Sequence, residues 1–305
     1  MEHRFDGRVA IVTGAGRGIG RAHARLLGSR GAKVVVNDLG GSMGGAGADA
    51  GPASAVVEEI TAAGGAAIAD GSDVATPEGA AALVDRAVDA FGRLDALINN
   101  AGIIRWGALA DVELEDLERH LAVHLVGSFN TIRAAWPHMV EARYGRIVNT
   151  TSTGVFGLPE NLAYAAAKGG VIGMTRSLAT AGARHGIRVN LLAPAALTRM
   201  AGQSTDDSDP AATGQGAMAP DLVAPMAAFL VHESCPVSGE IYTAGAGRFA
   251  RLFLASTVGA VVTDHEPTVE DVAEQWAAIN DETGYAVPAD LHAWSATFLA
   301  HLQSG

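Results

Sequence analysis

Tyr164 and Lys168 are the two residues whose types and spacing most directly suggest chemistry. They lie four positions apart, so on a helix their side chains would share one face. A tyrosine has a pKa of about 10 and transfers protons poorly at neutral pH, but a neighbouring ammonium group favours the phenolate and lowers that pKa. The pair could therefore interconvert a hydroxyl and a carbonyl group by acid/base catalysis. Exposed helices also carry such pairs by chance, so the position of this helix in the fold decides the interpretation.

A glycine-rich segment near the N-terminus could hold the phosphates of a nucleotide. Residues 13–20 follow the pattern T-G-x-x-x-G-x-G, after an apolar run and before a helical pattern. Such a loop brings backbone N–H groups and the positive end of a helix dipole against a pyrophosphate. The alternative is a glycine-rich turn without a ligand. The candidate contacts are Gly14, Arg17, Gly18, Ile19 and Gly20.

Asp38 is the candidate for recognising the ribose of a dinucleotide. It lies 18 residues after Gly20, at the end of a predicted strand, where a carboxylate can accept hydrogen bonds from the ribose 2′-OH. A carboxylate repels a 2′-phosphate, so Asp38 favours NAD over NADP, whereas Arg17 could pair with a phosphate. Asp38 could also be an ordinary turn aspartate. Asp73 and Val74 are candidates for covering the adenine, although Asp73 could instead cap a helix.

Short β-branched runs alternate with alanine-rich helical patterns along most of the chain. This alternation predicts an α/β fold with a parallel sheet covered on both faces, and it places Tyr164 on the helix after the fifth strand. The expected strands cover residues 9–12, 33–38, 66–70, 94–99, 146–150, 188–192 and 240–243. The expected helices cover 21–29, 53–63, 77–91, 114–142 with a break or bend near Pro137, 162–184 and 221–231.

Two segments depart from this alternation. Residues 199–219 are rich in small and polar residues, which predicts either a mobile lid over the site or a disordered insertion. Residues 250–305 are expected to form a helical extension that packs on the core or on a neighbouring subunit, with Thr268 as an N-cap and Asp271 at its third position. The remaining residues, 1–249, are expected to form one catalytic domain.

Composition excludes several functional classes. The 305 residues carry a formal net charge of −12 and contain no Lys/Arg run, which argues against nucleic-acid binding. No apolar run is long enough for a membrane span. The single cysteine, Cys235, cannot form an internal disulfide or a structural zinc site, so we expect a cytoplasmic protein without a metal.

The motifs together resemble the short-chain dehydrogenase/reductase family over about residues 7–247. The resemblance is carried by residues 13–20 and 99–102, by Ser152, and by Tyr164 with Lys168. It implies a Rossmann-type, doubly wound, parallel sheet of seven strands and hydride transfer to or from a nicotinamide cofactor. In that family's scheme Tyr164 is the acid/base, Lys168 holds the nicotinamide ribose and Ser152 bonds the substrate oxygen. The resemblance further implies cofactor contacts at Asn100, Ala101, Gly102, Pro194 and Thr198.

A narrower resemblance is to the (3R)-hydroxyacyl-CoA dehydrogenase module of peroxisomal multifunctional enzyme type 2. It is carried by residues 36–41, 123–129 and 133–139 and continues to residues 266–268. It implies NAD-dependent oxidation of a (3R)-hydroxyacyl-CoA with a fatty or steroid side chain, by a homodimer or homotetramer. A 3-ketoacyl reductase or a hydroxysteroid dehydrogenase is the alternative enzyme, and a catalytically silent nucleotide-binding scaffold is the alternative outside enzymes.

Three positions depart from the general family pattern. Counting back from Tyr164 puts Thr151 at the position of the family's serine, whereas counting forward from the preceding strand puts Ser152 there. His124 stands where the family often has an asparagine that takes part in a proton relay, and it could equally be a buried structural histidine. Pro194 is followed by Ala195 in place of the usual glycine.

Overall fold

The structure, a computed structural model, describes residues 2–198, 200 and 216–303. The chain divides into two compact units, Met1–Arg251 and Leu252–Gly305, which are described separately below. The division predicted from the sequence, 1–249 and 250–305, stays a prediction of domain organisation. The predicted lid at 199–219 lies outside the described residues except for Met200 and residues 216–219.

The first unit is built on one sheet of eight strands in the order β3-β2-β1-β4-β5-β6-β7-β8. The first seven strands are parallel, which confirms the Rossmann-type, doubly wound fold. The count of seven is wrong by one, because Ala246 and Gly247, both at positive φ, form a tight turn that adds β8. The strands are β1 Val9–Thr13, β2 Lys33–Asn37, β3 Ala66–Asp70, β4 Ala96–Asn99, β5 Gly145–Thr150, β6 Ile187–Pro194, β7 Ile241–Gly245 and β8 Arg248–Leu252.

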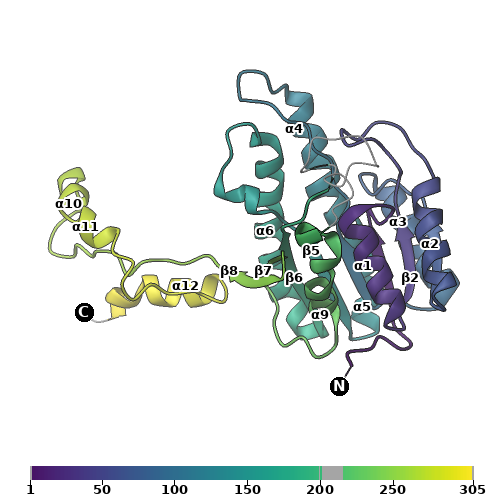
Figure 1. Cartoon of the computed structure of the whole chain (residues 1–305). Helices are drawn as coiled ribbons and strands as arrows, with labels where there is room; N and C mark the ends of the chain where they lie inside the picture. Colours follow the sequence, from purple (N-terminus) through teal and green to yellow (C-terminus); the bar gives the residue numbers. More distant parts are fainter. Residues whose placement is uncertain (1, 199, 201–215, 304–305) are drawn as a thin grey trace. The chain divides into compact units, whose positions relative to one another are not determined.

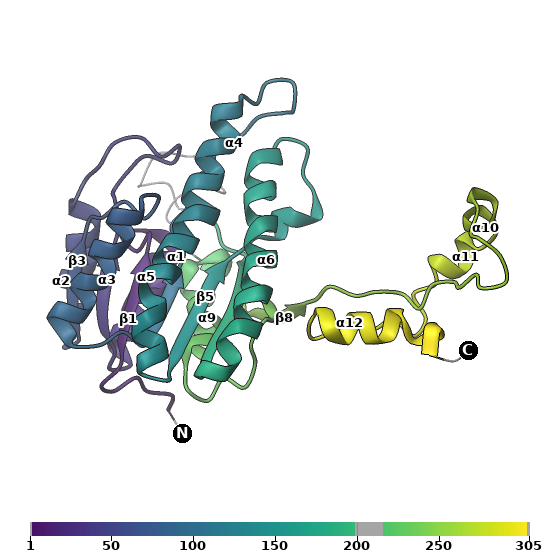
Figure 2. The same ribbon diagram turned by 180° about the vertical axis from the view of Figure 1, so that it is seen from behind.

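Helices cover both faces of this sheet. The helices α1, α2 and α9 pack on the face seen in Figure 1. The helices α3, α5 and α6 cover the opposite face, seen in Figure 2. Each layer buries the β-branched side chains of the central strands, as expected for parallel strands buried on both sides. The bounds are α1 Gly18–Ser29, α2 Gly51–Ala62, α3 Pro77–Phe91, α4 Leu114–His120, α5 Gly127–Glu141, α6 Leu162–Gly182 and α9 Ala224–Val231.

The strand order reverses between β1 and β4, and this reversal positions the site. In open parallel sheets, ligands bind in the crevice beyond the carboxyl ends of the strands at such a point. Thr13, the last residue of β1, ties the two strand ends together: its Oγ1 accepts hydrogen bonds from the backbone N–H groups of Asn100 and Ala101, both at 3.0 Å. The glycine loop follows β1, and residues 99–102 follow β4.

The long helical stretch before β5 is irregular at a place the sequence did not predict. Pro137 lies inside the continuous helix α5, so of the expected break or bend the break is wrong. Ala135 and Met139 on either side of Pro137 are fully buried, and this packing holds the helix through the proline. The irregularity is instead a π-helical segment, Leu121–Val126, between α4 and α5. Such segments occur frequently at functional sites, and this one contains His124.

The second unit contains three short helices, α10 Val269–Glu274, α11 Trp276–Ile279 and α12 Leu291–Phe298. The predicted N-cap at Thr268 is confirmed: its side chain accepts from Asp271 N, and Asp271 accepts from Thr268 N at 2.8 Å. An antiparallel bridge joins Ser256 and Ala286. None of residues 252–302, for which the structure describes side-chain burial, is buried.

Candidate active site

The glycine loop leaves no room for side chains at its turning points. Gly14 has φ +62°, and a Cβ there would lie 2.7 Å from Ala101 Cα. A Cβ on Gly20 would collide with the Gly14 carbonyl and lie 2.5 Å from Asn100 Nδ2. Because α1 begins at Gly18 without a side-chain cap, its first N–H groups remain available to an anion. The loop is therefore a backbone cradle with the geometry of a phosphate site.

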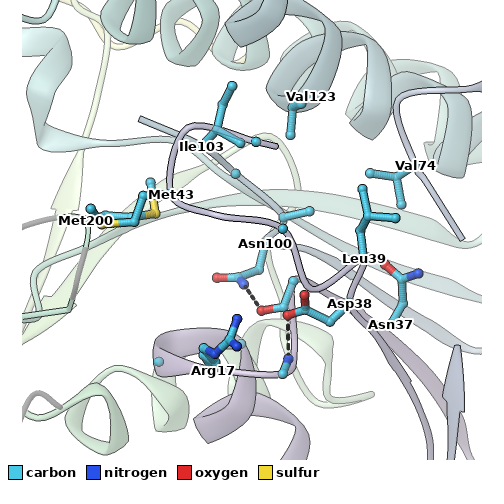
Figure 3. A pocket seen from close by; sticks show the side chains of 18 of the residues that line it. Arg17, Asn37, Asp38, Leu39, Met43, Val74, Asn100, Ile103, Val123 and Met200 are labelled. Carbon is cyan, nitrogen blue, oxygen red and sulfur yellow. Dashed lines mark hydrogen bonds between the residues drawn. The ribbon is translucent and has the colours of Figure 1, made fainter. Parts of the chain in front are cut away.

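A cavity of 410 Å³ opens beside this loop, and we call it the glycine-loop cavity (Figure 3). It is lined by the segments at and beyond the ends of β1, β2, β3, β4 and β6, and by Arg119 and Val123. Three predicted cofactor contacts, Tyr164, Lys168 and Pro194, are not in its lining. The predicted residues that do line it are Gly14, Arg17, Gly18, Ile19, Gly20, Asp38, Asp73, Val74, Asn100, Ala101, Gly102 and Thr198.

Asp38 occupies the end of β2 and uses both carboxylate oxygens. Its Oδ2 accepts from Gly16 N at 2.7 Å (Figure 3). Its Oδ1 accepts from Gly40 N at 2.7 Å. The bond from Gly40 N forms the local turn that is expected of an ordinary turn aspartate. The bond from Gly16 N joins the end of β2 to the glycine loop. Each oxygen keeps a further lone pair, so the carboxylate can still accept a ribose hydroxyl.

Asn100 and Asp73 each shape a segment that follows a strand. Asn100 Nδ2 donates to the carbonyl oxygens of Thr13 and Gly14 at 3.0 and 3.1 Å, so it fixes the start of the glycine loop. Asp73 Oδ1 accepts from Ala75 N at 2.9 Å in a turn before α3. The cap of α3 is Thr76, which excludes the alternative that Asp73 is the N-cap of this helix.

Tyr164 and Lys168 lie on the first two turns of α6, as predicted. Lys168 Nζ donates to Thr150 O at 2.7 Å and lies 5.6 Å from the centroid of the Tyr164 ring. Burial lowers the pKa of Lys168 from 10.5 to about 7. Burial also raises the pKa of Tyr164, and the nearby Ser152 side chain opposes this rise. The direction for Tyr164 is opposite to the one expected from an ammonium neighbour alone, because desolvation outweighs the other effects.

Ser152 and Thr151 differ in what their hydroxyl groups contact. The Ser152 side chain lies near enough to Tyr164 to lower the pKa of its hydroxyl, and its Oγ accepts from Gly154 N at 3.0 Å. Thr151 is buried, and its Oγ1 donates to the carbonyl of Lys168 at 2.9 Å. The structure therefore brings Ser152, Tyr164 and Lys168 together, with the Thr151 hydroxyl turned into the α6 backbone.

His124 is buried against the edge of the same cluster. Its Nε2 lies 2.9 Å from Ile103 O, and its ring packs edge-on to Tyr164 with centroids 5.2 Å apart. A Cβ on Gly102 would lie 2.5 Å from His124 Cε1, so Gly102 admits this ring. Burial, reinforced by Lys168, lowers the pKa of His124 well below 6.5. His124 Nδ1 has no hydrogen-bond partner, so one ring nitrogen is satisfied structurally and the other is not.

Several site residues were missed by the sequence analysis. His120 is fully buried, stacks on His124 at 5.9 Å and packs edge-on to Tyr164. Its spacing of four from His124 was the available signal. The glycines around positions 40–47 were the signal for the loop that lines the cavity. The lining residues not predicted as contacts are Gly16, Arg21, Asn37, Leu39, Gly41, Ser42, Met43, Gly45, Ser72, Ile103, Arg119, Val123 and Met200.

Within the part of the chain that the structure describes, no three or more His, Cys, Asp or Glu side chains are grouped so that they could hold a metal ion. No helix among the described residues has both the length and the apolar character to cross a membrane.

Comparison with known sequences decides the family. Residues 8–209 match the short chain dehydrogenase family. The chain belongs to this family. A short-chain type dehydrogenase/reductase from Mycobacterium tuberculosis is 44% identical over 278 residues, which are 91% of this chain and 95% of that protein. Peroxisomal multifunctional enzyme type 2 from Drosophila melanogaster is 42% identical over 282 residues, but these are 91% of this chain and only 46% of that enzyme.

Solved structures of short-chain dehydrogenases agree with this assignment. A short chain dehydrogenase from Mycobacterium avium superimposes with a TM-score of 0.77 at 37% identity, covering 91% of this chain and 97% of that one. A 7α-hydroxysteroid dehydrogenase in complex with NADH and 7-oxo glycochenodeoxycholic acid superimposes with a TM-score of 0.69 at 31% identity, covering 80% and 95%. The chain is thus an oxidoreductase of a family that uses a nicotinamide cofactor, and its glycine cradle and cavity fit such a dinucleotide.

Proposed function

We propose that this short-chain dehydrogenase oxidises a (3R)-hydroxyacyl-CoA to the 3-ketoacyl-CoA with NAD. The observation that carries the proposal is the position of Lys168, whose buried Nζ lies 5.6 Å from the Tyr164 ring centroid beyond the end of β5, with Ser152 near enough to lower the pKa of Tyr164. The 42% identity to peroxisomal multifunctional enzyme type 2 over 91% of this chain supports the acyl-CoA class. This chain spans just under half of that enzyme.

In this mechanism Ser152 and Tyr164 orient the substrate hydroxyl. A bound nicotinamide would supply the acceptor for the hydride that leaves C3. Tyr164, as phenolate, removes the hydroxyl proton, so the substrate loses one proton and one hydride and becomes a ketone. Lys168 keeps two ammonium protons beyond its bond to Thr150 O, which suits it to hold a ribose hydroxyl. Its positive charge then favours the Tyr164 phenolate, and the proton passes from Tyr164 to solvent.

The proposal includes a preference for NAD over NADP. The Asp38 carboxylate lines the glycine-loop cavity, held by the N–H groups of Gly16 and Gly40. A 2′-phosphate beside it would meet a fixed negative charge. Arg17 lines the same cavity and could attract such a phosphate. We give Asp38 the larger effect because its position is fixed by two hydrogen bonds.

An apolar rim beside Ser152 and Tyr164 supports an apolar substrate. Phe156, Leu158 and Leu162 are exposed on the segment between these two residues. A bridge between Gly107 and Asn161 brings the loop that carries half-exposed Trp106 beside that segment. A fatty acyl or steroid side chain would cover such a surface, whereas a small polar substrate would not.

The same site could run in reverse or accept a steroid. The similarity to a 7α-hydroxysteroid dehydrogenase favours a hydroxysteroid as the second candidate substrate, and a 3-ketoacyl substrate would use the same residues for reduction. We further propose a cytoplasmic homodimer or homotetramer. The single free cysteine, buried Cys235, fits a reducing compartment, and the exposed apolar side chains of the second unit fit contacts with another copy.

NADH formation from matched acyl-CoA substrates tests the proposal. We expect turnover with (3R)-hydroxyacyl-CoA and NAD, little with the (3S) isomer, and a slower rate with NADP. A panel of chain lengths, steroid-CoA esters and free hydroxysteroids then ranks the candidates. Turnover of free hydroxysteroids alone would replace the acyl-CoA assignment with the second candidate. Asp38→Ala should narrow the difference in kcat/KM between NAD and NADP, and an unchanged ratio would remove Asp38 from that role.

A further inference from the structure

A loop that leaves β2 forms one wall of the glycine-loop cavity. Residues 39–49, which we call the strap, have joined ends, because Asp49 N donates to Leu39 O at 2.9 Å. Their tip is a tight turn in which Ser42 N donates to Ala46 O at 2.8 Å. The strap is therefore a compact Ω-type loop closed on itself. Its cavity-lining residues are Leu39, Gly41, Ser42, Met43 and Gly45.

The tip of the strap is held from outside by donors on the segment after β4 and on α4. Three consecutive carbonyl groups of the strap each accept one hydrogen bond from these donors. The bonds are Ile104 N to Met43 O at 3.0 Å, Arg105 Nε to Gly44 O at 3.1 Å and Arg119 Nη2 to Gly45 O at 2.9 Å. Hydrogen bonds from charged donors are the stronger kind, so the two arginines dominate this attachment.

The two arginines stand differently towards the cavity. Arg119 lines the glycine-loop cavity as well as holding the strap. Arg105 holds the strap but is absent from the cavity lining, and its guanidinium is anchored by Asp116 at 2.9 Å. Arg105 would therefore affect a ligand in the cavity by holding the strap and not by direct contact.

We propose that Arg105 and Arg119 are positioning residues that hold the strap closed over a bound dinucleotide and so set its rate of release. The proposal rests on the proposed use of a nicotinamide dinucleotide by this cavity. Opening of a loop and release of product limit turnover in many enzymes, and this attachment would be the element that opens. Neither arginine needs to touch the reacting atoms for this effect.

Release of NADH from the full chain tests the proposal directly. NADH fluorescence is followed by stopped flow while excess NAD displaces it. We expect release at least about fivefold faster in Arg105→Met and in Arg119→Met, because each loses one charge-assisted hydrogen bond. Arg105→Gln and Arg119→Gln keep an N–H donor and should lie between these variants and the wild type. Arg86→Met is the matched control, since Arg86 Nε makes the same kind of bond, to Ala69 O at 3.1 Å, outside the cavity.

Hydrogen exchange gives a second readout that needs no dinucleotide. The Ile104 amide donates to the strap at Met43 O, so its exchange reports each opening of the strap. We expect faster exchange of this amide in Arg105→Met than in the wild type or in Arg86→Met.

The outcomes separate the possible failures. Unchanged NADH release in both methionine variants overturns the proposal while leaving the proposed function intact. Equal acceleration in Arg119→Met and Arg119→Gln, with Arg105→Met unchanged, also overturns it, because Arg119 would then act by its charge on the ligand. A wild-type chain that binds neither NADH nor NADPH contradicts the proposed function itself, and the proposal falls with it.

Discussion

The two halves of the site are built from different parts of the chain. The glycine-loop half presents backbone groups, and its geometry depends on the absence of side chains at Gly14 and Gly20. The tyrosine half presents side chains, and Tyr164 and Lys168 are held there although burial disfavours their charged forms. The first half should therefore be sensitive to added atoms. The tyrosine half should be sensitive to the loss of single polar atoms. Burial of its titratable side chains should also lower the stability of the folded protein.

Tyr164→Phe is expected to give the largest effect on turnover. The substitution removes one oxygen from the acid/base position and keeps the ring that packs against His124. We expect kcat to fall by about 10²–10⁴-fold, the usual contribution of general acid–base catalysis. NADH binding, measured by fluorescence titration, should stay within about twofold, since binding to the glycine loop does not need the phenol. Retained turnover would contradict the assignment of Tyr164 as the acid/base.

Gly20→Ala tests the opposite sensitivity in the glycine-loop half. The added methyl group would collide with the Gly14 carbonyl and crowd Asn100. We expect a loss of about 1–3 kcal/mol in the free energy of unfolding, together with weaker NADH binding. Gly71→Ala is the control, because a Cβ at Gly71 would meet nothing within 4 Å. Equal urea midpoints and NADH affinities for the two variants would contradict the cradle.

Lys168→Met should separate activity from stability. Burial lowers the pKa of Lys168 to about 7, so the folded state binds this proton less tightly than the unfolded state. The wild type therefore gains stability as the pH rises from about 7 to 10.5, and below this window the full burial cost remains. We expect Lys168→Met to be inactive, yet more stable by about 1–3 kcal/mol at pH 7, an advantage that shrinks at higher pH.

Urea unfolding at pH 7 and 9 measures this difference. Lys33→Met, at an exposed lysine on β2, is the control and should change neither activity nor the pH dependence. A less stable Lys168→Met would show that the bond from Nζ to Thr150 O outweighs the cost of burial.

His23→Leu is expected to have the smallest effect, which is on the pH dependence of stability. It tests whether burial of a titratable side chain also lowers stability in the glycine-loop half. His23 on α1 is buried without a hydrogen-bond partner at either ring nitrogen, and burial lowers its pKa to about 3. Between pH 6.5 and 3 the unfolded chain binds the extra proton, so the wild type loses stability as the pH falls. As the pH falls through this window, the free energy of unfolding of the leucine variant should decrease less than that of the wild type, by up to about 1.4 kcal/mol per pH unit.

Denaturant midpoints at pH 7.5 and pH 5 provide the measurement for His23→Leu. His138→Leu, at a partly exposed histidine on α5, serves as the control. Parallel pH curves for the wild type and His23→Leu would mean that His23 finds a partner in solution.

The sequence predicted what depends on neighbours along the chain. The seven parallel strands, the N-cap at Thr268 and the shared helix face of Tyr164 and Lys168 follow from local pattern and spacing. The choice between Ser152 and Thr151 did not follow, because counting from two sides gave two answers and only packing against α6 separates them.

The sequence could not predict contacts made by backbone carbonyl groups far apart in the chain. Arg119 and Gly45 are 74 residues apart, and a carbonyl acceptor leaves no mark on residue type. The pKa direction of Tyr164 was also out of reach, since it depends on the depth of burial rather than on the neighbouring lysine. The sequence does not predict the strand β8, because the expected extension begins at residue 250, inside this strand.

The π-helical segment at Leu121–Val126 lets its helix take in extra length without changing the directions in which the residues before and after it face. A π turn takes in more residues than an α turn. One residue added to a regular α-helix would instead rotate everything after it by about 100°. Before the segment, His120 faces Tyr164; after it, Thr131 Oγ1 donates to Asn99 Oδ1 at 2.7 Å. Loss of one residue within the segment would therefore leave both of these faces in place and move only His124, so this helix can change in length at the site without losing its register on the sheet.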